Sequence, residues 1–304
     1  MADTYIGTTD GVFRLGSGGL ERMDLASLDV TALHAADGVL LAGTYGDGLF
    51  RREEGEWERV ADGVFRFVTP ELAGTEPARV LRSTDAGRSW DDLGVAEVPG
   101  HEQWFLPYSP RAGAARNADV AGDRLLVAAE VAGLLRSDDG GESWVCEPVD
   151  GDEDIHQVTT HPDDPDLVFV SLGTASLHER GEHGGIARSR DGGRTWERVE
   201  TDYTRSTIVP PSRPDLLVAG PARRVGREGR IVVSADGGDS WEPAGDGIEV
   251  PMPDMVELFV PAPDGEVWAI CSRGRLLRAQ PGEWSWSSPL PPDAQLTVKS
   301  VAFA

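Results

Sequence analysis

Four residues of this chain belong to types that commonly carry out acid–base or nucleophilic chemistry. They are Glu130, Asp154, His156 and Tyr203. Carboxyl and imidazole groups act as general acids and bases, and a tyrosine hydroxyl can act as a nucleophile when a neighbouring base activates it. We therefore predict that these four residues are catalytic.

A second set of residues is suited to binding anions and rings. Arginine presents a planar fork of donors that matches carboxylate and phosphate groups, and aromatic side chains cover the apolar parts of a ligand. The predicted ligand-binding residues are His101, Trp104, Arg205, Arg223 and Arg224. This set predicts an anionic small molecule or an acidic peptide as the partner.

Histidines also raise the prospect of a metal. His156, His178 and His183 supply nitrogen ligands, and Glu130 or Asp154 could add oxygen, a mixture that Zn, Mn or Fe accepts. Their spacing matches no compact metal motif, so such a site requires separate loops to meet. A divalent metal is the one cofactor that the sequence suggests.

The elements that must position these residues follow from a repeat. The pattern Ser-x-Asp-x-Gly-x-(Ser/Thr)-Trp, which we call the box, occurs four times, around Asp85, Asp139, Asp191 and Asp236. Apolar residues precede each copy, and Asp and Gly favour tight turns. Each box therefore predicts a structural turn between two strands.

Three further segments have the same apolar lead-in without a complete box, and together the repeats make seven units. Their equivalent positions, which we take as third strands, lie near residues 14, 51, 82, 136, 188, 233 and 278. About 43 residues per unit is typical of a four-stranded propeller blade. We predict an all-β, seven-bladed β-propeller with antiparallel blades, formed as one domain by residues 1–304. The C-terminal segment 296–303 should supply the missing inner strand of blade one and close the ring.

Propeller topology separates the boxes from the candidate site. The boxes join third to fourth strands, whereas the loops between blades lie on the opposite face. That opposite face should carry four of the six histidines and a pocket at the channel mouth, lined mainly by blades three to six. The boxes should therefore be structural.

The box pattern resembles the Asp-box, or bacterial neuraminidase repeat, propellers, which include sialidases, sortilin-type receptors and photosystem II assembly factors. The stretches 130–136, 154–156 with His161-Pro162, and 104–107 are similar to small sialidase-like propellers of bacteria and archaea, often labelled glycosyl hydrolases. The resemblance implies a propeller that binds, and in the sialidase case hydrolyses, an anionic or sugar-like ligand.

Three functions stay open. A sialidase-type glycosidase would use the tyrosine, carboxylates and arginines named above, but sialidases usually have six blades and an Arg-Ile-Pro-like motif near the N-terminus that this chain lacks. A metal-supported hydrolase or lyase would use the histidines. A non-catalytic propeller would bind a ligand or a protein, or serve as an assembly scaffold. The sequence leaves open whether the protein is an enzyme.

Composition limits the partners and the compartment. The formal net charge is −24 and Lys299 is the only lysine, which argues against binding to nucleic acid or anionic membranes. The chain shows no signal-like start and no run of ~20 apolar residues, so we expect a cytoplasmic protein, and we expect a monomer. A single lysine among many arginines, with Asp outnumbering Glu, is typical of salt-loving archaea or of a GC-rich genome, and the acidity predicts stability that rises with salt.

Overall fold

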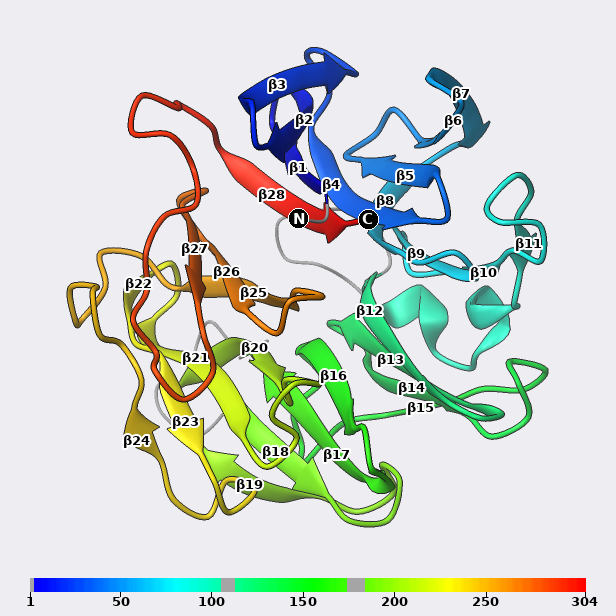
Figure 1. Ribbon diagram of the computed structural model, residues 1–304. Helices are drawn as coiled ribbons and strands as arrows, with labels where there is room; N and C mark the ends of the chain where they lie inside the picture. The colour runs from blue at the N-terminus through cyan, green and yellow to red at the C-terminus, as the bar shows by residue number, and fades with distance from the viewer. Residues whose placement is uncertain (1–2, 105–112, 174–183) are drawn as a thin grey trace.

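The computed structural model describes residues 3–104, 113–173 and 184–304, and their strands form seven sheets around a central axis (Figure 1). From the axis outward, blades one to three contain β28 (Val298–Phe303), β1 (Thr4–Thr8), β2 (Gly11–Gly16) and β3 (Gly19–Asp24); β4 (Val30–Ala36), β5 (Val39–Thr44), β6 (Leu49–Glu53) and β7 (Glu56–Ala61); and β8 (Val64–Val68), β9 (Leu72–Glu76), β10 (Val80–Arg82) and β11 (Asp91–Asp92).

Blades four to seven follow the same order. They contain β12 (Ala114–Ala121), β13 (Arg124–Glu130), β14 (Gly133–Ser137) and β15 (Val145–Glu147); β16 (Ile155–His161), β17 (Asp164–Leu172), β18 (Gly185–Ser189) and β19 (Glu197–Glu200); β20 (Tyr203–Ile208), β21 (Leu217–Arg224), β23 (Val232–Ser234) and β24 (Glu242–Pro243); and β25 (Val256–Pro261), β26 (Val267–Cys271) and β27 (Leu276–Ala279).

The predicted seven-bladed architecture of antiparallel blades is confirmed, with two local variations. Blade six adds the short strand β22 (Arg227–Gly229), which pairs with β21. In blade seven the outer strand is reduced to a bridge between Arg278 and Ser287. The short 3-10 helices η1 (Val95–Glu97) and η2 (His101–Gln103) connect blades three and four, and no helix in the described residues could span a bilayer.

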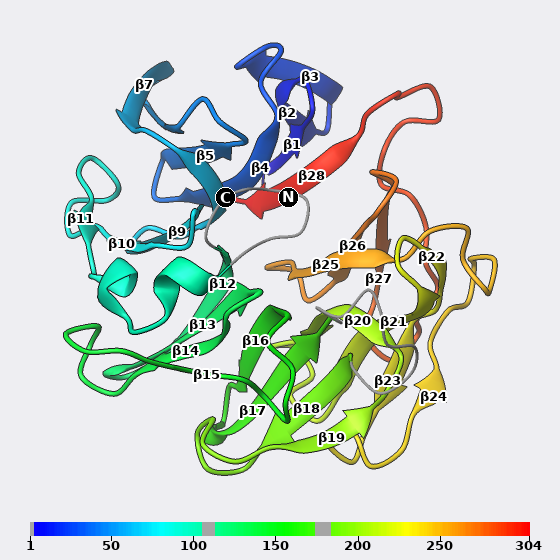
Figure 2. The same cartoon turned by 180° about the vertical axis from the view of Figure 1, so that it is seen from behind.

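The ring closes as predicted. Strand β28 pairs antiparallel with β1, from Phe303 beside Thr4 to Val298 beside Thr8. Figures 1 and 2 show the two ends of the chain lying together at this closure. Pairing both ends in one blade leaves no open inner edge, which would otherwise expose unpaired backbone groups.

The core consists of seven apolar clusters, one at each contact between neighbouring blades. Strand β13, the second strand of blade four, shows why strands inside a blade have continuous apolar sequences. Leu125 and Val127 face the cluster shared with blade three, while Leu126 and Ala128 face the cluster shared with blade five. Alternate side chains of a strand point to opposite faces, so both faces of a sandwiched strand must be apolar.

The boxes form turns that are stabilised by their own side chains. In the box of blade four, the Ser137 hydroxyl donates to the Asp139 carboxylate at 2.7 Å and accepts the Gly141 N–H at 2.7 Å. The Asp139 carboxylate also accepts the N–H and the hydroxyl of Ser143. Equivalent bonds occur in the other three boxes, around Asp85, Asp191 and Asp236.

The box tryptophans connect each blade to the one before it. Trp144 donates its indole N–H to the carbonyl of Leu93 at 2.9 Å, and Trp241 donates to the carbonyl of Val199 at 3.1 Å. Strand register places the boxes away from the candidate site: Ser137 pairs with the start of β13, whereas Glu130 ends β13 opposite Ala114. The box carboxylates therefore lie at the sheet edge opposite Glu130.

Candidate functional site

Each of the seven inner strands carries a β-bulge near its start. The pairing of β16 with β17, for example, runs from Ile155 directly to Gln157 and leaves His156 out of register. A bulge re-aims the side chain of the extra residue. The residues left out of register are Thr31, Arg66, Arg116, His156, Arg205 (together with Ser206), Glu257 and Lys299.

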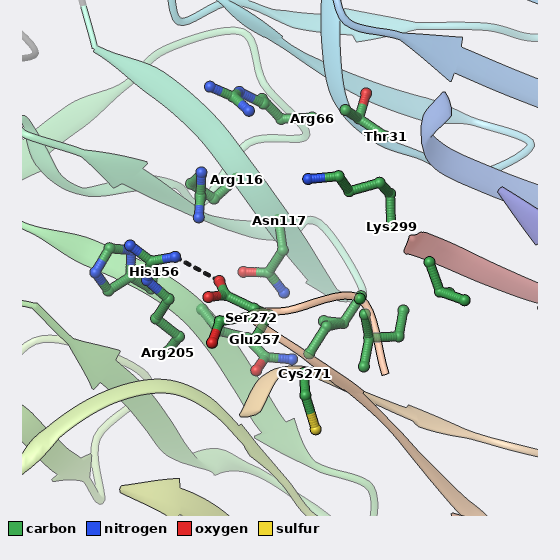
Figure 3. A pocket seen from close by; sticks show the side chains of 15 residues that line it. Thr31, Arg66, Arg116, Asn117, His156, Arg205, Glu257, Cys271, Ser272 and Lys299 are labelled. Atoms are coloured by element: carbon green, nitrogen blue, oxygen red, sulfur yellow. Dashed lines mark hydrogen bonds and ion pairs between the residues drawn. The ribbon is translucent and has the colours of Figure 1, made fainter. Parts of the chain in front are cut away.

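Seven of these residues, one from each inner strand, line a single central cavity of about 340 Å³ (Figure 3). We call Thr31, Arg66, Arg116, His156, Arg205, Glu257 and Lys299 the bulge ring. The expectation that blades three to six dominate the pocket is therefore too narrow, because blades one, two and seven also contribute. The cavity is an axial site that needs the whole propeller.

The bulge ring is rich in cations although the chain as a whole is strongly acidic. Arg66, Arg116, Arg205 and Lys299 face one acid in the ring, Glu257. Arg66 and Arg116 each form an ion pair with a buried glutamate that ends the second strand of the same blade, Glu76 and Glu130; the latter contact is 3.2 Å. These pairs hold the guanidinium groups in place at the cavity wall.

Lys299 differs from the three arginines. It is exposed, and in the part of the chain that the structure describes its amine forms no ion pair or hydrogen bond. Figure 3 shows its side chain extending toward the middle of the cavity from β28. The only lysine of the protein thus presents a positive charge at the axis that no described residue neutralises.

Behind the ring wall, Glu130, Asp154 and His156 come together. One potential ligand atom from each lies within 4.8 Å of the others, and all three residues are buried. Asp154 Oδ2 lies 3.7 Å from His156 Nε2. The structure thus brings three of the four predicted catalytic residues into one cluster.

Burial and neighbouring charges set the protonation of this cluster. Burial, and then the negative charges of Glu130 and Asp152, raise the pKa of Asp154 to about 7. Burial also holds the pKa of His156 well below its usual range, so the imidazole is neutral at neutral pH. The Asp154 carboxyl group therefore changes its protonation state near neutral pH.

Tyr203, the fourth predicted catalytic residue, connects this cluster to the ring. Its hydroxyl contacts His156 Nε2 at 3.0 Å and accepts a hydrogen bond from Arg205 Nε at 2.7 Å. Burial raises the pKa of Tyr203 to about 12, so the phenol keeps its proton at neutral pH. Arg205 also donates to Glu257 at 2.5 Å, which completes a chain of contacts across blades five, six and seven.

Two predicted ligand-binding residues lie in packing positions. Trp104 is buried in the cluster between blades three and four, and its ring centroid lies 4.7 Å from that of His101. His101 Nε2 lies 3.2 Å from the carbonyl of Ala78. Neither residue lines the central cavity within the described residues, and packing accounts for both.

The other predicted residues are also away from the cavity or outside the described residues. Arg223 and Arg224 are exposed at the end of β21, and Arg224 pairs with Glu228 at 3.5 Å. Neither lines the cavity among the described residues, so the cationic loop of blade six is separate from the bulge ring. His178 and His183 lie outside the described residues. Of the predicted ligand-binding set, Arg205 alone belongs to the bulge ring.

Sequence reasoning missed Thr31 and four charged residues of the ring: Arg66, Arg116, Glu257 and Lys299. Each of these four lies directly after the first apolar or small residues of an inner strand, as in Phe65-Arg66-Phe67 and Val256-Glu257-Leu258. Aligning the starts of the seven inner strands would have shown this shared position. The bulge that turns the position toward the axis is not visible in the sequence itself.

Comparison with known proteins identifies the fold and a broad relationship. No protein-family model matches the chain. The photosystem II assembly lipoprotein Ycf48 of Synechococcus sp. (strain CC9902) is 26% identical over 223 residues, which cover 70% of this chain and 57% of Ycf48. The chain therefore spans little more than half of this curated relative.

Solved structures give the same result. The GH74 xyloglucanase from Xanthomonas campestris is 16% identical with a TM-score of 0.64, over 99% of this chain and 52% of that one. A structure of Ycf48 bound to D1 peptide is 16% identical with a TM-score of 0.50, over 86% and 73%. The chain is a seven-bladed β-propeller similar to both. At these identities the likeness shows the fold alone.

Proposed function

We propose that this propeller binds an anionic group, a carboxylate or a phosphate, in its central cavity through the bulge ring. The bulge ring is the observation that carries the proposal. The bulge of every inner strand directs one residue into the cavity, and four of these seven residues are cations. The formal net charge of the chain is −24, so four cations around one cavity contrast with the acidity of the chain as a whole. Arginine and lysine donors are the usual protein partners of carboxylates and phosphates.

The three arginines and the lysine would act differently. Arg66, Arg116 and Arg205 are held by glutamates, which fix the planes of their guanidinium groups at the cavity wall. Lys299 has no such partner among the described residues, so binding an anion there breaks no ion pair. Lys299 should therefore make the largest electrostatic contribution to affinity.

The anionic group can come from a small molecule or from the end of an acidic peptide. The similarity to Ycf48, one structure of which is described as bound to D1 peptide, supports including a peptide. The resemblance to sialidase-like propellers supports including a sugar acid. Both sources present the same carboxylate to the ring, so one experiment can compare them.

We propose binding without hydrolysis as the function. Glu130 and Asp154 are not among the cavity-lining residues of the described structure, because they lie behind Arg116 and His156. A ligand seated in the ring would meet His156, Arg205, Lys299 and the single carboxylate of Glu257, whereas a glycosidase usually needs a pair of carboxylates. Catalysis by Glu130, Asp154, His156 and Tyr203 stays a prediction from the sequence.

The single lysine allows a direct test. Reductive methylation with ¹³C-formaldehyde labels Lys299 and the terminal amine, and leaves the lysine charge intact. We expect inorganic phosphate, N-acetylneuraminate or an acidic peptide to move the Lys299 methyl resonance saturably, while matched KCl does not. A peptide that acts only with a free C-terminus would identify a chain end as the source.

Two variants locate the effect. Arg116→Met should weaken the response of Lys299, and Arg224→Met, which removes an exposed arginine outside the cavity, should not. Lys299 and terminal-amine resonances that move together, without saturation, would overturn the proposal, since that pattern reports ionic strength alone.

A further inference from the structure

We infer that Glu130, Asp154 and His156 form a binding site for one divalent transition-metal ion. Glu130 ends β13, and Asp154 and His156 flank the first residue of β16, so two segments that are distant in the sequence meet at one point. Their potential ligand atoms lie within 4.8 Å of one another. The inference is independent of anion binding in the cavity.

Two buried atoms of this cluster have no hydrogen-bond partner among the described residues. They are Oδ1 of Asp154 and Nδ1 of His156, and the two residues are only 8% and 5% exposed. A buried polar atom without a partner costs free energy, typically about 1–3 kcal/mol. A metal ion coordinated by the carboxylate and the imidazole would supply the missing interaction.

The surroundings hold the cluster in place. Gly173 donates its N–H to the Asp154 carbonyl at 2.7 Å, and the Asp154 N–H donates to Asp152 Oδ1 at 3.0 Å. The Tyr203 hydroxyl contacts Nε2 of His156 at 3.0 Å. Metal-binding histidines and carboxylates are commonly oriented by such outer contacts.

The lack of a side chain at position 173 is part of the geometry. A Cβ atom at Gly173 would lie 2.2 Å from Asp154 Oδ2 and 2.5 Å from His156 Nε2. Both distances are far below van der Waals contact, so any other residue would push the two ligands apart. Gly173 has an ordinary backbone conformation, and space rather than φ is what requires glycine here.

The donor set indicates the class of ion. Two carboxylates and one imidazole suit Zn²⁺, Mn²⁺, Fe²⁺ or Co²⁺, whereas Ca²⁺ prefers ligands that are all oxygen atoms. Three protein ligands leave coordination positions for water. Arg116 pairs with Glu130 at 3.2 Å, so the Glu130 carboxylate would contact both this guanidinium and the metal ion.

The test must separate one specific site from an acidic surface. Wild-type protein is dialysed against Zn²⁺ or Co²⁺ in the presence of excess Mg²⁺ and KCl, which occupy exposed carboxylates, and the retained metal is measured by mass spectrometry. We expect one equivalent to be retained. The visible spectrum of the Co²⁺ form should show the bands of a site with nitrogen and oxygen ligands.

Three variants and one control locate the ion. Asp154→Asn and His156→Gln should lose the retained equivalent and the Co²⁺ bands, and Gly173→Ala should do so without removing any ligand. Asp47→Asn, which changes an exposed carboxylate outside both the cluster and the bulge ring, should retain both. Equal retention by wild type and the ligand variants, or no retention by folded wild type, would overturn the inference. Neither result would bear on anion binding at Lys299.

Discussion

Arg205 Nε donates a hydrogen bond to the hydroxyl of Tyr203 at 2.7 Å, although both residues lie on the same strand, β20, two positions apart. The bulge at Arg205 and Ser206 makes this contact possible by turning the guanidinium toward the axis. The tyrosine thereby becomes the link between the buried acidic cluster and the ring. Its hydroxyl satisfies Arg205 and His156 at once.

Tyr203→Phe should therefore destabilise the protein. The substitution keeps the ring but leaves a guanidinium N–H and a buried imidazole nitrogen without their partner, a loss of roughly 1–3 kcal/mol in the free energy of unfolding. Denaturant titration measures the change. Tyr45→Phe is the matched control, because the Tyr45 side chain is exposed and its hydroxyl forms no hydrogen bond among the described residues. Equal losses in the two variants would contradict this role of Tyr203.

Two neighbouring aspartates should respond in opposite directions to the same substitution. Asp154→Asn removes a buried negative charge beside Glu130 and should raise the melting temperature at pH 8 in the presence of a chelator. Asp152→Asn should lower it, because the Asp152 carboxylate accepts the N–H groups of Asp154 and Gly184 at 3.0 and 2.9 Å. We expect each shift to be a few degrees, about 2–4 °C per kcal/mol for a chain of this size. A lower melting temperature for Asp154→Asn would show that its carboxylate is stabilising.

The four boxes predict an acid-sensitive contribution to stability. Hydrogen bonds from Ser143, and from Ser137, hold the pKa of Asp139 well below its usual range. A carboxyl whose pKa is lower in the folded state stabilises the fold above its unfolded pKa, near 3.8, and this contribution is lost as pH falls toward the folded pKa. Asp139→Asn should lower the melting temperature at pH 7 and have a smaller effect at pH 3.

A surface aspartate without such bonds serves as the control for the boxes. Asp47 is exposed, and its carboxylate forms no hydrogen bond among the described residues. Asp47→Asn should leave the melting temperature at pH 7 almost unchanged. If Asp139→Asn behaved like Asp47→Asn at pH 7, the box carboxylates would not be supporting their turns.

The overall charge predicts that salt stabilises the protein. With a formal net charge of −24, repulsion between carboxylates opposes the compact state, and added ions screen it within a Debye length of about 10 Å at 0.1 M salt. We expect the melting temperature to rise between dilute buffer and molar KCl. A melting temperature that stays constant or falls as KCl is added would show that the surface ion pairs already compensate the excess charge.

The sequence predicted the ring because the box residues determine their own turns. Ser137, Asp139 and Gly141 bond to one another within one turn, so a local pattern was sufficient to locate it. The catalytic candidates also converge as expected, because propeller topology brings the starts of inner strands to one channel mouth. Trp104 packs between two blades, and nothing in the sequence distinguishes such an aromatic residue from one that covers a ligand.

The bulge ring could not be predicted in the same way. Arg66 and Lys299 are 233 positions apart and meet only because the two ends of the chain close one blade. Whether each side chain points to the axis depends on a bulge, and the bulge depends on pairing with the next strand rather than on local residues. The charge and direction of the site are therefore properties of the assembled ring.

The central claim is that anions bind at the axis, and calorimetric titration of paired variants tests it most directly. Wild type, Lys299→Met and Arg224→Met are each titrated with N-acetylneuraminate, inorganic phosphate and an acidic peptide at fixed ionic strength. We predict that Lys299→Met weakens binding of the active anion by about tenfold, as expected for losing one charge contact of ~1.4 kcal/mol, while Arg224→Met binds like wild type. Unchanged affinity in Lys299→Met, or a loss confined to Arg224→Met, would contradict the account and move anion binding to the surface of blade six.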